Sequence, residues 1–269
     1  MPSVARYLTP VLSNRSVADD FYELQLHWPP EAAIPRPGLF LTIRSADGSV
    51  RLLRRPFAFS RYDREDNSAR IIYKLRGTAT TQLAAKRPFD TIDILAPLGT
   101  GFPLPEPDTR PILVAGGIGV GPILFLARTL IAHATEPRVI VGARTAGGLP
   151  PLPAEEYGEV IACTEDGSYG HRGTAVEALS SYLETTSISN NSGESVLYLC
   201  GPEPMLAAAH RLAIECGITA YVALEQTMGC AIGACMGCAV RVRGPEKYAR
   251  VCTEGPVFDS RTIDWRTTT

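Results

Sequence analysis

The sequence lacks the features that mark membrane proteins, secreted proteins and nucleic-acid-binding proteins. In its 269 residues no apolar run reaches the ~18 residues that a membrane-spanning helix needs. The opening segment, Met1 to Arg6, lacks the apolar core of a secretory signal peptide. The 26 lysines and arginines nearly balance the 28 aspartates and glutamates, and no basic run is interleaved with aromatic residues. We therefore expect a soluble cytoplasmic protein in a reducing compartment, without nucleic-acid or membrane partners.

Cysteine is scarce until the C-terminal region, where four of the seven cysteines gather. Cys230, Cys235 and Cys238 have the Cys-x4-Cys-x2-Cys spacing of plant-type two-iron two-sulfur clusters, and Cys252 follows after a short loop. Glycine and alanine between them let the backbone wrap closely around an inorganic core. The spacing predicts a 2Fe-2S cluster held by these four thiolates.

Zinc and disulfides are the alternatives for these cysteines. Structural zinc sites more often use two separated Cys-x2-Cys pairs, whereas the triplet here is contiguous. Disulfides fit poorly with a chain that shows no signal peptide. The remaining cysteines, Cys163, Cys200 and Cys216, stand singly in apolar or helical segments and are expected to be buried free thiols.

The first hundred residues show the alternating pattern of β-strands. Residues Phe21–Trp28, Leu39–Arg44 and Ala69–Leu75 alternate and are separated by proline and glycine, which predicts a small antiparallel barrel. At its rim lies Arg54-Arg-Pro-Phe-Ala-Phe-Ser60. An arginine followed by an extended aromatic segment could bind a phosphate and a flat cofactor, although Arg-Pro-Phe is also an ordinary beginning of a strand.

Beyond a proline-rich segment at 103–111 the pattern changes to alternating strands and helices. An apolar strand at Ile112–Ala115 leads into the turn Gly116-Gly-Ile-Gly-Val-Gly121, and a helix follows from Pro122. Glycines let the backbone approach a ligand, and the free amides of a helix N-terminus suit a pyrophosphate. A tight strand-to-helix turn without any ligand remains the alternative.

The same unit recurs near residue 200. A strand at Val196–Cys200, the turn Gly201-Pro-Glu-Pro204 and a helix at Met205–Cys216 follow one another. Alternating units predict a parallel sheet with its ligand crevice at the carboxyl ends of the strands, where both turns fall. The first turn is not a Rossmann fingerprint, because Pro122 stands where its last glycine would be and no acidic residue ends the strand at 138–144.

Taken together, these motifs resemble the ferredoxin reductase superfamily, and more closely the electron-transfer subunits of type B dihydroorotate dehydrogenases. The most specific part is the ending, in which Met228-Gly-Cys-Ala-Ile-Gly-Ala-Cys-Met-Gly-Cys238 is followed by Val251-Cys-Thr-Glu-Gly-Pro-Val-Phe258. Pro97-Leu-Gly-Thr-Gly-Phe102 and Asp166-Gly-Ser-Tyr-Gly170 are further signatures of that family. The resemblance covers essentially the whole chain.

The resemblance implies a multi-domain protein with three cofactors. We expect an FAD-binding antiparallel β-barrel at 1–104, an α/β NAD-binding domain with a parallel sheet at 105–218 and a small iron-sulfur domain at 219–269. Residues expected to hold FAD are Arg55, Pro56, Phe57, Ala58, Ser60, Tyr73, Lys74, Leu75, Gly77, Ala79 and Thr80. Residues expected to hold NAD are Gly116, Gly117, Gly119, Gly121, Cys200, Gly201 and Pro202.

Two departures from the family pattern concern the flavin site. Ala79 stands where the family usually has glycine before the threonine that meets the FAD diphosphate. Phe57 and Ala58 replace a hydroxyl-bearing pair common in the superfamily, so hydrogen bonds to the flavin ring must come from backbone amides or Ser60.

The implied function is a relay from the FMN of a separate dihydroorotate dehydrogenase catalytic subunit, through the cluster and FAD, to NAD+ in pyrimidine biosynthesis. The family assembles as a heterotetramer of two plus two chains. No catalytic acid or base is expected, because hydride transfer itself requires none. One alternative is a reductase subunit that joins NAD(P)H to ferredoxin or a hydrogenase, since Arg144 could accommodate a 2′-phosphate. A non-catalytic scaffold is opposed by the retention of all four cysteines and both glycine turns.

Overall fold

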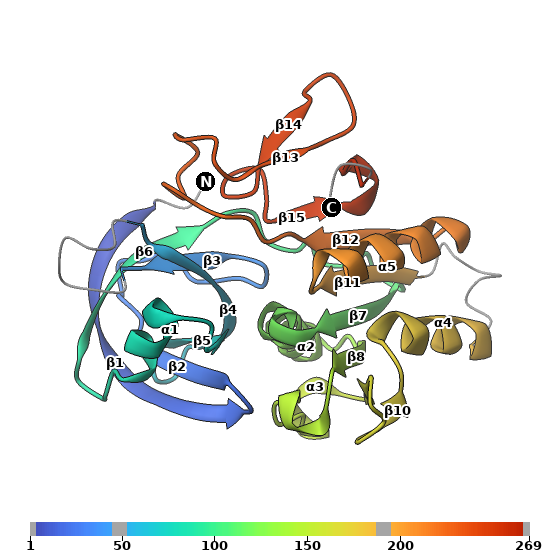
Figure 1. Ribbon diagram of the computed structural model, residues 1–269, viewed down its shortest axis with the longest axis horizontal. Coiled ribbons are helices and arrows are strands. Elements are labelled where there is room, and N and C mark those ends of the chain that lie inside the picture. Colours follow the sequence, from blue (N-terminus) through green and yellow to red (C-terminus); the bar gives the residue numbers. More distant parts are fainter. Residues whose placement is uncertain (1–3, 45–52, 187–194, 266–269) are drawn as a thin grey trace.

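The computed structural model describes residues 4–44, 53–186 and 195–265. In Figure 1 a β-barrel lies beside an α/β unit, and the C-terminal part of the chain extends across the top of both. The predicted fold class, an antiparallel barrel followed by a parallel sheet and a small C-terminal unit, is confirmed. Within the described ranges, no helix combines the length and apolar character needed to cross a membrane.

The N-terminal part forms a closed antiparallel barrel with strand order β1-β2-β5-β4-β3-β6. Apolar side chains alternate into its interior, where Trp28, Phe59 and Tyr73 are fully buried. The three segments predicted as strands correspond to the second, third and fifth strands. The elements are β1 (Ala5–Ala18), β2 (Phe21–His27), β3 (Phe40–Ile43), β4 (Arg55–Asp63), β5 (Ser68–Lys74), α1 (Thr78–Ala84) and β6 (Thr91–Leu98).

The second part is a seven-stranded sheet with order β10-β9-β8-β7-β11-β12-β15, parallel except for its last strand. Its central strands are apolar on both faces, as parallel strands covered by helices are. The strands are β7 (Arg110–Gly116), β8 (Arg138–Ala143), β9 (Val160–Thr164), β10 (His171–Arg172), β11 (Ser195–Cys200), β12 (Thr219–Ala223) and β15 (Val257–Asp259).

Helices cover both faces of this sheet. The helical elements are η1 (Gly117–Gly119), α2 (Val120–Ala132), η2 (Ala146–Gly148), α3 (Ala154–Tyr157), α4 (Ala175–Thr185) and α5 (Glu203–Glu215). One core contains side chains of α2 and α3, and another contains those of α4 and α5. The predicted strand-turn-helix units are therefore present, with α2 and α5 beginning at Val120 and Glu203, two residues earlier than the sequence predicts.

The C-terminal segment leaves the sheet after β12 and returns to it at β15. Between them lie the cysteine-rich loop and a small hairpin, β13 (Ala239–Arg241) and β14 (Tyr248–Arg250). A short helix, η5 (Ser260–Thr262), follows β15 and packs on α5. There the His210 ring shares a 3.0 Å hydrogen bond with the Ser260 hydroxyl and stacks on the Trp265 ring. The domain boundary expected at residue 218 falls just before β12, which pairs with β11.

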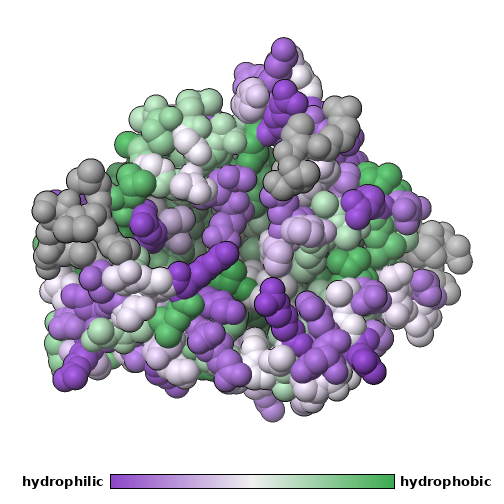
Figure 2. Space-filling model, viewed as in Figure 1, coloured by the Kyte–Doolittle hydropathy of each residue, from purple (hydrophilic) through white to green (hydrophobic). Residues whose placement is uncertain are grey.

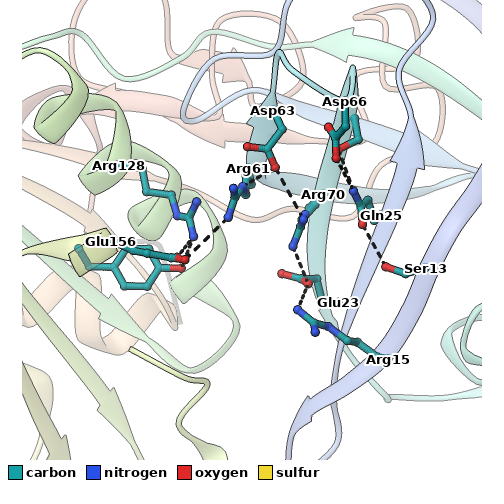
Figure 3. Close-up of polar contacts among 12 residues, drawn as sticks. Ser13, Arg15, Glu23, Gln25, Arg61, Asp63, Asp66, Arg70, Arg128 and Glu156 are labelled. Carbon is teal, nitrogen blue, oxygen red and sulfur yellow. Dashed lines mark hydrogen bonds and ion pairs between the residues drawn. The ribbon is translucent and has the colours of Figure 1, made fainter. Parts of the chain in front are cut away.

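A chain of alternating charges crosses from the barrel to the α/β unit (Figure 3). The crossing contact joins Arg61 of β4 to Glu156 of α3 at 3.9 Å, and Arg128 of α2 also pairs with Glu156. On the barrel side Arg70 continues the chain to Asp63 at 3.7 Å. Each exposed pair contributes about 1 kcal/mol or less. Helix α2 itself packs against β4, so apolar packing rather than charge accounts for most of this contact.

Candidate functional site

The first candidate site is the rim of the barrel along β4. Arg55, Pro56, Phe57 and Ala58 are partly buried there, and Ser60 is 5% exposed. The Ser60 hydroxyl oxygen is buried and finds no hydrogen-bond partner in the described part of the chain. Leaving a buried hydroxyl unpaired costs about 1–3 kcal/mol. A ligand atom seated on β4 would relieve that cost, so this strand fits a polar, planar cofactor.

Two neighbouring arginines at this rim have different surroundings. Arg54 forms an ion pair with Asp93 at 2.6 Å, and Arg6 pairs with the same carboxylate at 3.0 Å. Burial opposes the charged form of Asp93, but its bonds to Arg6 and Arg54 outweigh this and hold its pKa below the usual range. Arg55 donates to the Leu53 carbonyl at 3.2 Å, and no carboxylate of the described residues pairs with it. Arg55 is therefore the arginine with a guanidinium available for an anion.

The other residues expected at the flavin site lie on β5. Tyr73 is buried, donates to Asn14 at 2.9 Å and meets the Phe57 ring edge-on at 5.9 Å. Burial raises its pKa well above the ordinary range, while the bond to Asn14 acts in the opposite direction. Lys74 is exposed, with its ammonium 5.3 Å from the centroid of the Phe21 ring. The Leu75 amide donates to the Asp20 carbonyl at 2.8 Å.

The turn from β5 into α1 is open on one side. Gly77 has φ +143°, and a side chain there would meet no atom within 4 Å. Thr80 is occupied within the turn, since its hydroxyl accepts from the Arg76 amide at 2.8 Å and donates to the Gly77 carbonyl at 3.0 Å. Ala79, the residue that departs from the family pattern, is buried within α1. The free surface at this turn is thus backbone, which suits a phosphate.

The two glycine turns of the sheet interlock at its carboxyl edge. A Cβ on Gly119 would lie 2.2 Å from the Cys200 carbonyl oxygen, and one on Gly116 would lie 2.5 Å from the Met205 sulfur. A Cβ on Gly201 would be 2.7 Å from the Met205 methyl carbon. Gly117 has φ +54°, a conformation that glycine adopts readily. Gly119 is therefore required by the packing of one turn's backbone on the other, whereas Gly116 and Gly201 leave room for the Met205 side chain.

Gly121 joins this turn to the flavin strand. A Cβ at Gly121 would lie 3.5 Å from the Ser60 Cβ and 3.8 Å from that of Ile72. The first turn of α2 therefore lies close to β4 and β5 of the barrel, with room for no more than one methyl group between them. Residues expected to hold two different cofactors are thus brought near each other.

Cys200 and Pro202 frame the second turn. Cys200 ends β11, and burial together with the nearby Glu225 raises the pKa of its thiol to about 12. This thiol is neutral near pH 7 and is not an activated nucleophile. Pro202 precedes the first residue of α5, Glu203, whose Oε1 atom is buried without a hydrogen-bond partner among the described residues. The sequence reasoning missed Glu203, because an acid in the first turn of a helix is commonplace.

The four C-terminal cysteines are gathered as two pairs. The thiols of Cys230 and Cys235 are neighbours, as are those of Cys238 and Cys252, and the Cys235 amide donates to the Cys230 sulfur at 3.4 Å. Cys238 and Cys252 are buried, whereas Cys235 is exposed. Among the described residues no three His, Cys, Asp or Glu side chains are arranged to hold one metal ion. Two pairs fit a cluster in which each of two irons takes two thiolates.

The backbone of the cysteine loop turns its amides toward sulfur. Ala231, Gly233 and Met236 all have positive φ, which is unusual for alanine and methionine. Burial would raise the pKa of Cys230, but hydrogen bonds from the amides of Ile232, Cys235 and Ala234 lower it to about 7. Burial raises the pKa of Cys252 to about 12, and its neighbour Cys238 adds to the rise. Such oriented amides stabilise sulfur in its anionic, metal-binding form.

The turn that carries Cys252 is attached to the barrel. The Thr100 amide donates to the Gly255 carbonyl at 2.6 Å, and the Thr100 hydroxyl donates to the Thr253 carbonyl at 3.2 Å. Phe40 and Leu98 of the barrel share an apolar core with Cys238 and Cys252. The Cys238–Cys252 pair thus lies against the barrel that also carries Ser60.

Comparison with known proteins identifies the family. A family model described as the iron-sulfur cluster binding domain of dihydroorotate dehydrogenase B matches residues 225–264. A "Dihydroorotate dehydrogenase B (NAD(+)), electron transfer subunit" of Geobacillus kaustophilus is 37% identical over 262 residues, covering 95% of this chain and 97% of that protein. A Desulforamulus reducens protein with the same name is 31% identical over 95% of this chain and 97% of its own length. The chain belongs to the dihydroorotate dehydrogenase B electron transfer subunit family.

Solved structures agree with the fold of this family. A chain of an NADH-dependent reduced ferredoxin-NADP oxidoreductase superposes with a TM-score of 0.79 at 25% identity, covering 97% of this chain and 91% of that chain. A ferredoxin NADP+ reductase from Neisseria gonorrhoeae, solved with bound FAD and NADP, gives 0.65 at 16% identity over 79% of this chain and 92% of its own. The latter shows that the barrel and the parallel sheet follow the ferredoxin reductase fold.

The structure adds contacts to this family's sequence motifs that spacing alone does not reveal. Gly121 lies close to Ser60. Thr100, in the Pro97–Phe102 signature, is hydrogen-bonded to the turn that carries Cys252. Arg144, the residue that keeps an NADP-linked function open, is exposed just after β8. The signature itself could have marked Thr100 as important. It could not have identified the partner, Thr253, which lies 153 positions away in the sequence.

Proposed function

We propose that this chain is the electron-transfer subunit of a dihydroorotate dehydrogenase B. It relays electrons from the FMN of a separate catalytic subunit through a 2Fe-2S cluster and FAD to NAD+, within pyrimidine biosynthesis in the cytoplasm. When bound, FAD exchanges a hydride with NAD and single electrons with the cluster. The observation that supports this best is the close approach of the NAD turn at Gly121 to the flavin strand at Ser60, in a chain related along its length to such subunits.

FAD is assigned to the barrel rim. Arg55 binds its diphosphate, because its guanidinium is the one at this rim without a carboxylate partner among the described residues. Ser60 supplies a hydroxyl that is otherwise unpaired, in keeping with the loss of hydroxyls at Phe57 and Ala58. The open turn around Gly77 offers backbone to a phosphate. The remaining residues assigned to this site are Pro56, Tyr73, Lys74, Leu75, Ala79 and Thr80.

NAD is assigned to the carboxyl edge of the sheet. The interlocked turns present the amides of two helix N-termini, α2 and α5, to a dinucleotide pyrophosphate. The residues assigned to this site are Gly116, Gly117, Gly119, Gly121, Cys200, Gly201 and Pro202. Domain limits of 1–104, 105–218 and 219–269 go with these assignments, with β12 and β15 completing the sheet of the middle domain.

The cluster is assigned to Cys230, Cys235, Cys238 and Cys252, whose pairing suits two irons. The cysteine loop exposes Ile232 and Met236, at 54% and 52% of their surface. This apolar tip is where we place the catalytic subunit that contains FMN and oxidises dihydroorotate. Its assembly with this chain is proposed to be a heterotetramer of two plus two.

The cluster assignment is tested by exchanging one cysteine. Cys235→Ser should lose most of its iron and sulfide, because a hydroxyl is a poorer ligand than a thiolate. NADH-dependent reduction of a dye should survive, since NAD and FAD lie on the other side of the relay. Cys216→Ser is the matched control, because Cys216 is a partly exposed cysteine directly after α5 and outside the loop. Unchanged iron and sulfide in Cys235→Ser would contradict the assignment.

The relay is tested by reconstitution with a dihydroorotate dehydrogenase catalytic subunit containing FMN. The isolated chain should oxidise NADH with artificial acceptors and leave dihydroorotate untouched. The reconstituted pair should reduce NAD+ at the expense of dihydroorotate. Failure of the pair to do so, together with efficient ferredoxin reduction by the isolated chain, would favour the reductase of ferredoxin or hydrogenase systems instead.

A further inference from the structure

The four cysteines form two pairs, and each pair is held differently. Cys238 and Cys252 flank the β13–β14 hairpin, whose ladder pairs Ala239 with Arg250. The Val251 amide also donates to the Cys238 carbonyl at 3.1 Å. This pair is therefore fixed by backbone bonds and by burial. The other pair, Cys230 and Cys235, lies in a loop that has no place in that ladder.

One side chain joins the loop to the Cys252 turn. The Arg250 guanidinium donates through Nη1 to the Gly233 carbonyl at 3.0 Å, midway between Cys230 and Cys235. Through Nε it also donates to the two carboxylate oxygens of Glu254, at 3.2 Å and 3.0 Å. Glu254 in turn accepts from the Arg250 amide at 2.7 Å and from the Thr253 hydroxyl at 3.0 Å. The arginine is thus oriented by the turn and directed at the loop.

The Cys230–Cys235 loop packs closely against Arg250 and the Cys252 turn. Gly233 has φ +83°, and a Cβ there would lie 2.9 Å from Thr253 Cγ2 and 3.2 Å from Arg250 Nη1. The approach is close enough that only glycine fits without a shift. Arg250 stands two residues before Cys252 in the chain and donates into the Cys230–Cys235 loop, so its guanidinium places a positive charge beside the proposed ligands. A nearby cation stabilises thiolate ligands and favours an added electron.

We propose that Arg250, held by Glu254, is a positioning residue that fixes the Cys230–Cys235 loop against the Cys252 turn and so controls retention of the cluster and its reduction potential. This inference rests on the proposed function, since it presumes that the cysteines carry a cluster. Glu254 orients the guanidinium, whose planar fork serves the carboxylate and the carbonyl at once. Neither residue is among the proposed ligands.

The experiment uses the full chain with its cofactors and four variants. Arg250→Gln removes the charge and the fork, Arg250→Lys keeps the charge alone, and Glu254→Gln removes the support. Arg241→Gln is the matched control, because Arg241 belongs to the same hairpin and lies over the Tyr248 ring. Iron release to a chelator, the visible circular dichroism of the cluster and its midpoint potential are measured. Far-ultraviolet circular dichroism reports the fold.

We expect Arg250→Gln to release iron about tenfold faster than wild type, as loss of a charged hydrogen bond on a partly exposed side chain implies. Its cluster potential should fall, because removing a cation disfavours the reduced state. Arg250→Lys should release iron faster but keep a potential near that of wild type. Glu254→Gln should resemble Arg250→Lys in iron release, and Arg241→Gln should match wild type in every measurement.

Wild-type release rates and spectra in Arg250→Gln would overturn the inference and leave the proposed function intact. Equal effects of Arg241→Gln and Arg250→Gln would overturn it as well, since any arginine of the hairpin would then serve. If Arg250→Gln does not fold, unchanged iron release in both Arg250→Lys and Glu254→Gln overturns it. Absence of iron and sulfide from the wild-type protein would overturn the proposed function and this inference together.

Discussion

An alanine at position 119 would place its methyl group inside the backbone of the neighbouring turn. The new Cβ would lie 2.2 Å from the Cys200 carbonyl oxygen, 2.4 Å from its carbonyl carbon and 2.7 Å from the Gly201 nitrogen. Comfortable contact between heavy atoms begins at about 3.5 Å. All three obstacles are backbone atoms, so no side chain can rotate away. The turns that we assign to NAD would have to separate by about 1 Å.

That separation has consequences for both stability and activity. Overpacking of this kind costs about 1–3 kcal/mol, and displacing reacting groups by about 1 Å costs on the order of 100-fold in rate. We expect Gly119→Ala to lose about 1–3 kcal/mol in its free energy of unfolding. The value of kcat/KM for NADH with an artificial acceptor should fall by about 100-fold. FAD and iron contents should stay as in wild type, since both sites lie outside this turn.

Urea unfolding followed by circular dichroism and NADH oxidation kinetics provide the two measurements. Gly121→Ala is the control for stability, because its Cβ would lie 3.5 Å from that of Ser60, an ordinary contact. It should be at least as stable as wild type, since glycine within a helix costs about 1 kcal/mol relative to alanine. If Gly119→Ala were as stable and as active as wild type, the two turns would not be packed against each other as described.

Three further predictions concern charged residues. Arg55→Ala should weaken FAD binding by about 10- to 100-fold, with the cluster spectrum unchanged; stoichiometric FAD after gel filtration would refute that placement. The pKa of Asp93 is lowered by its arginine partners although burial opposes them, so its stabilisation is present above about pH 4 and is lost as the pH falls through its folded-state pKa. Asp93→Asn should therefore cost about 1 kcal/mol at pH 7 and progressively less as the pH falls below about 4, and a loss that does not change with pH in urea titrations would contradict this. Glu156→Gln removes the pairs with Arg61 and Arg128 and should cost less than about 1 kcal/mol at low salt, vanishing near 1 M salt; a loss independent of salt would point to packing.

Local patterns predicted three of the six barrel strands and missed the longest one, β1. The strands β2 and β5 alternate because one of their faces is buried in the barrel, whereas β3 is a short strand with all four residues buried. β1 exposes Leu8 and Leu12 at 65% and 37%, on the same outward face as Pro10. Apolar residues therefore stand on both faces, the alternation is lost, and proline argues against a strand. Its membership in the barrel is set by pairing with β2 and β6, which no local pattern reports.

The candidate sites divide in the same way. The cysteines could be recognised from spacing, because three of them lie within one short loop whose geometry is local. The positions of the motifs relative to one another depend on residues far apart in the sequence. Gly121 lies close to Ser60, and Thr100 is hydrogen-bonded to the turn that carries Cys252. The orphaned oxygen of Glu203 is likewise invisible in sequence, since burial of a helix-initiating acid depends on the neighbouring strands.

The cysteine-rich segment is best understood as an insertion between two strands of the nucleotide sheet. It leaves at the end of β12 and returns at β15, and these strands are antiparallel neighbours in which Ala223 pairs with Val257. Its two ends are therefore fixed at one sheet edge, and Thr100 supplies a third attachment on the barrel. Three attachments to two rigid bodies leave a small unit little freedom to tilt. Because electrons must cross between cofactors held by different parts of the chain, the relay requires this fixed placement. Truncation of the chain at residue 218 would remove the cysteine-rich segment together with β12 and β15, the edge of the sheet.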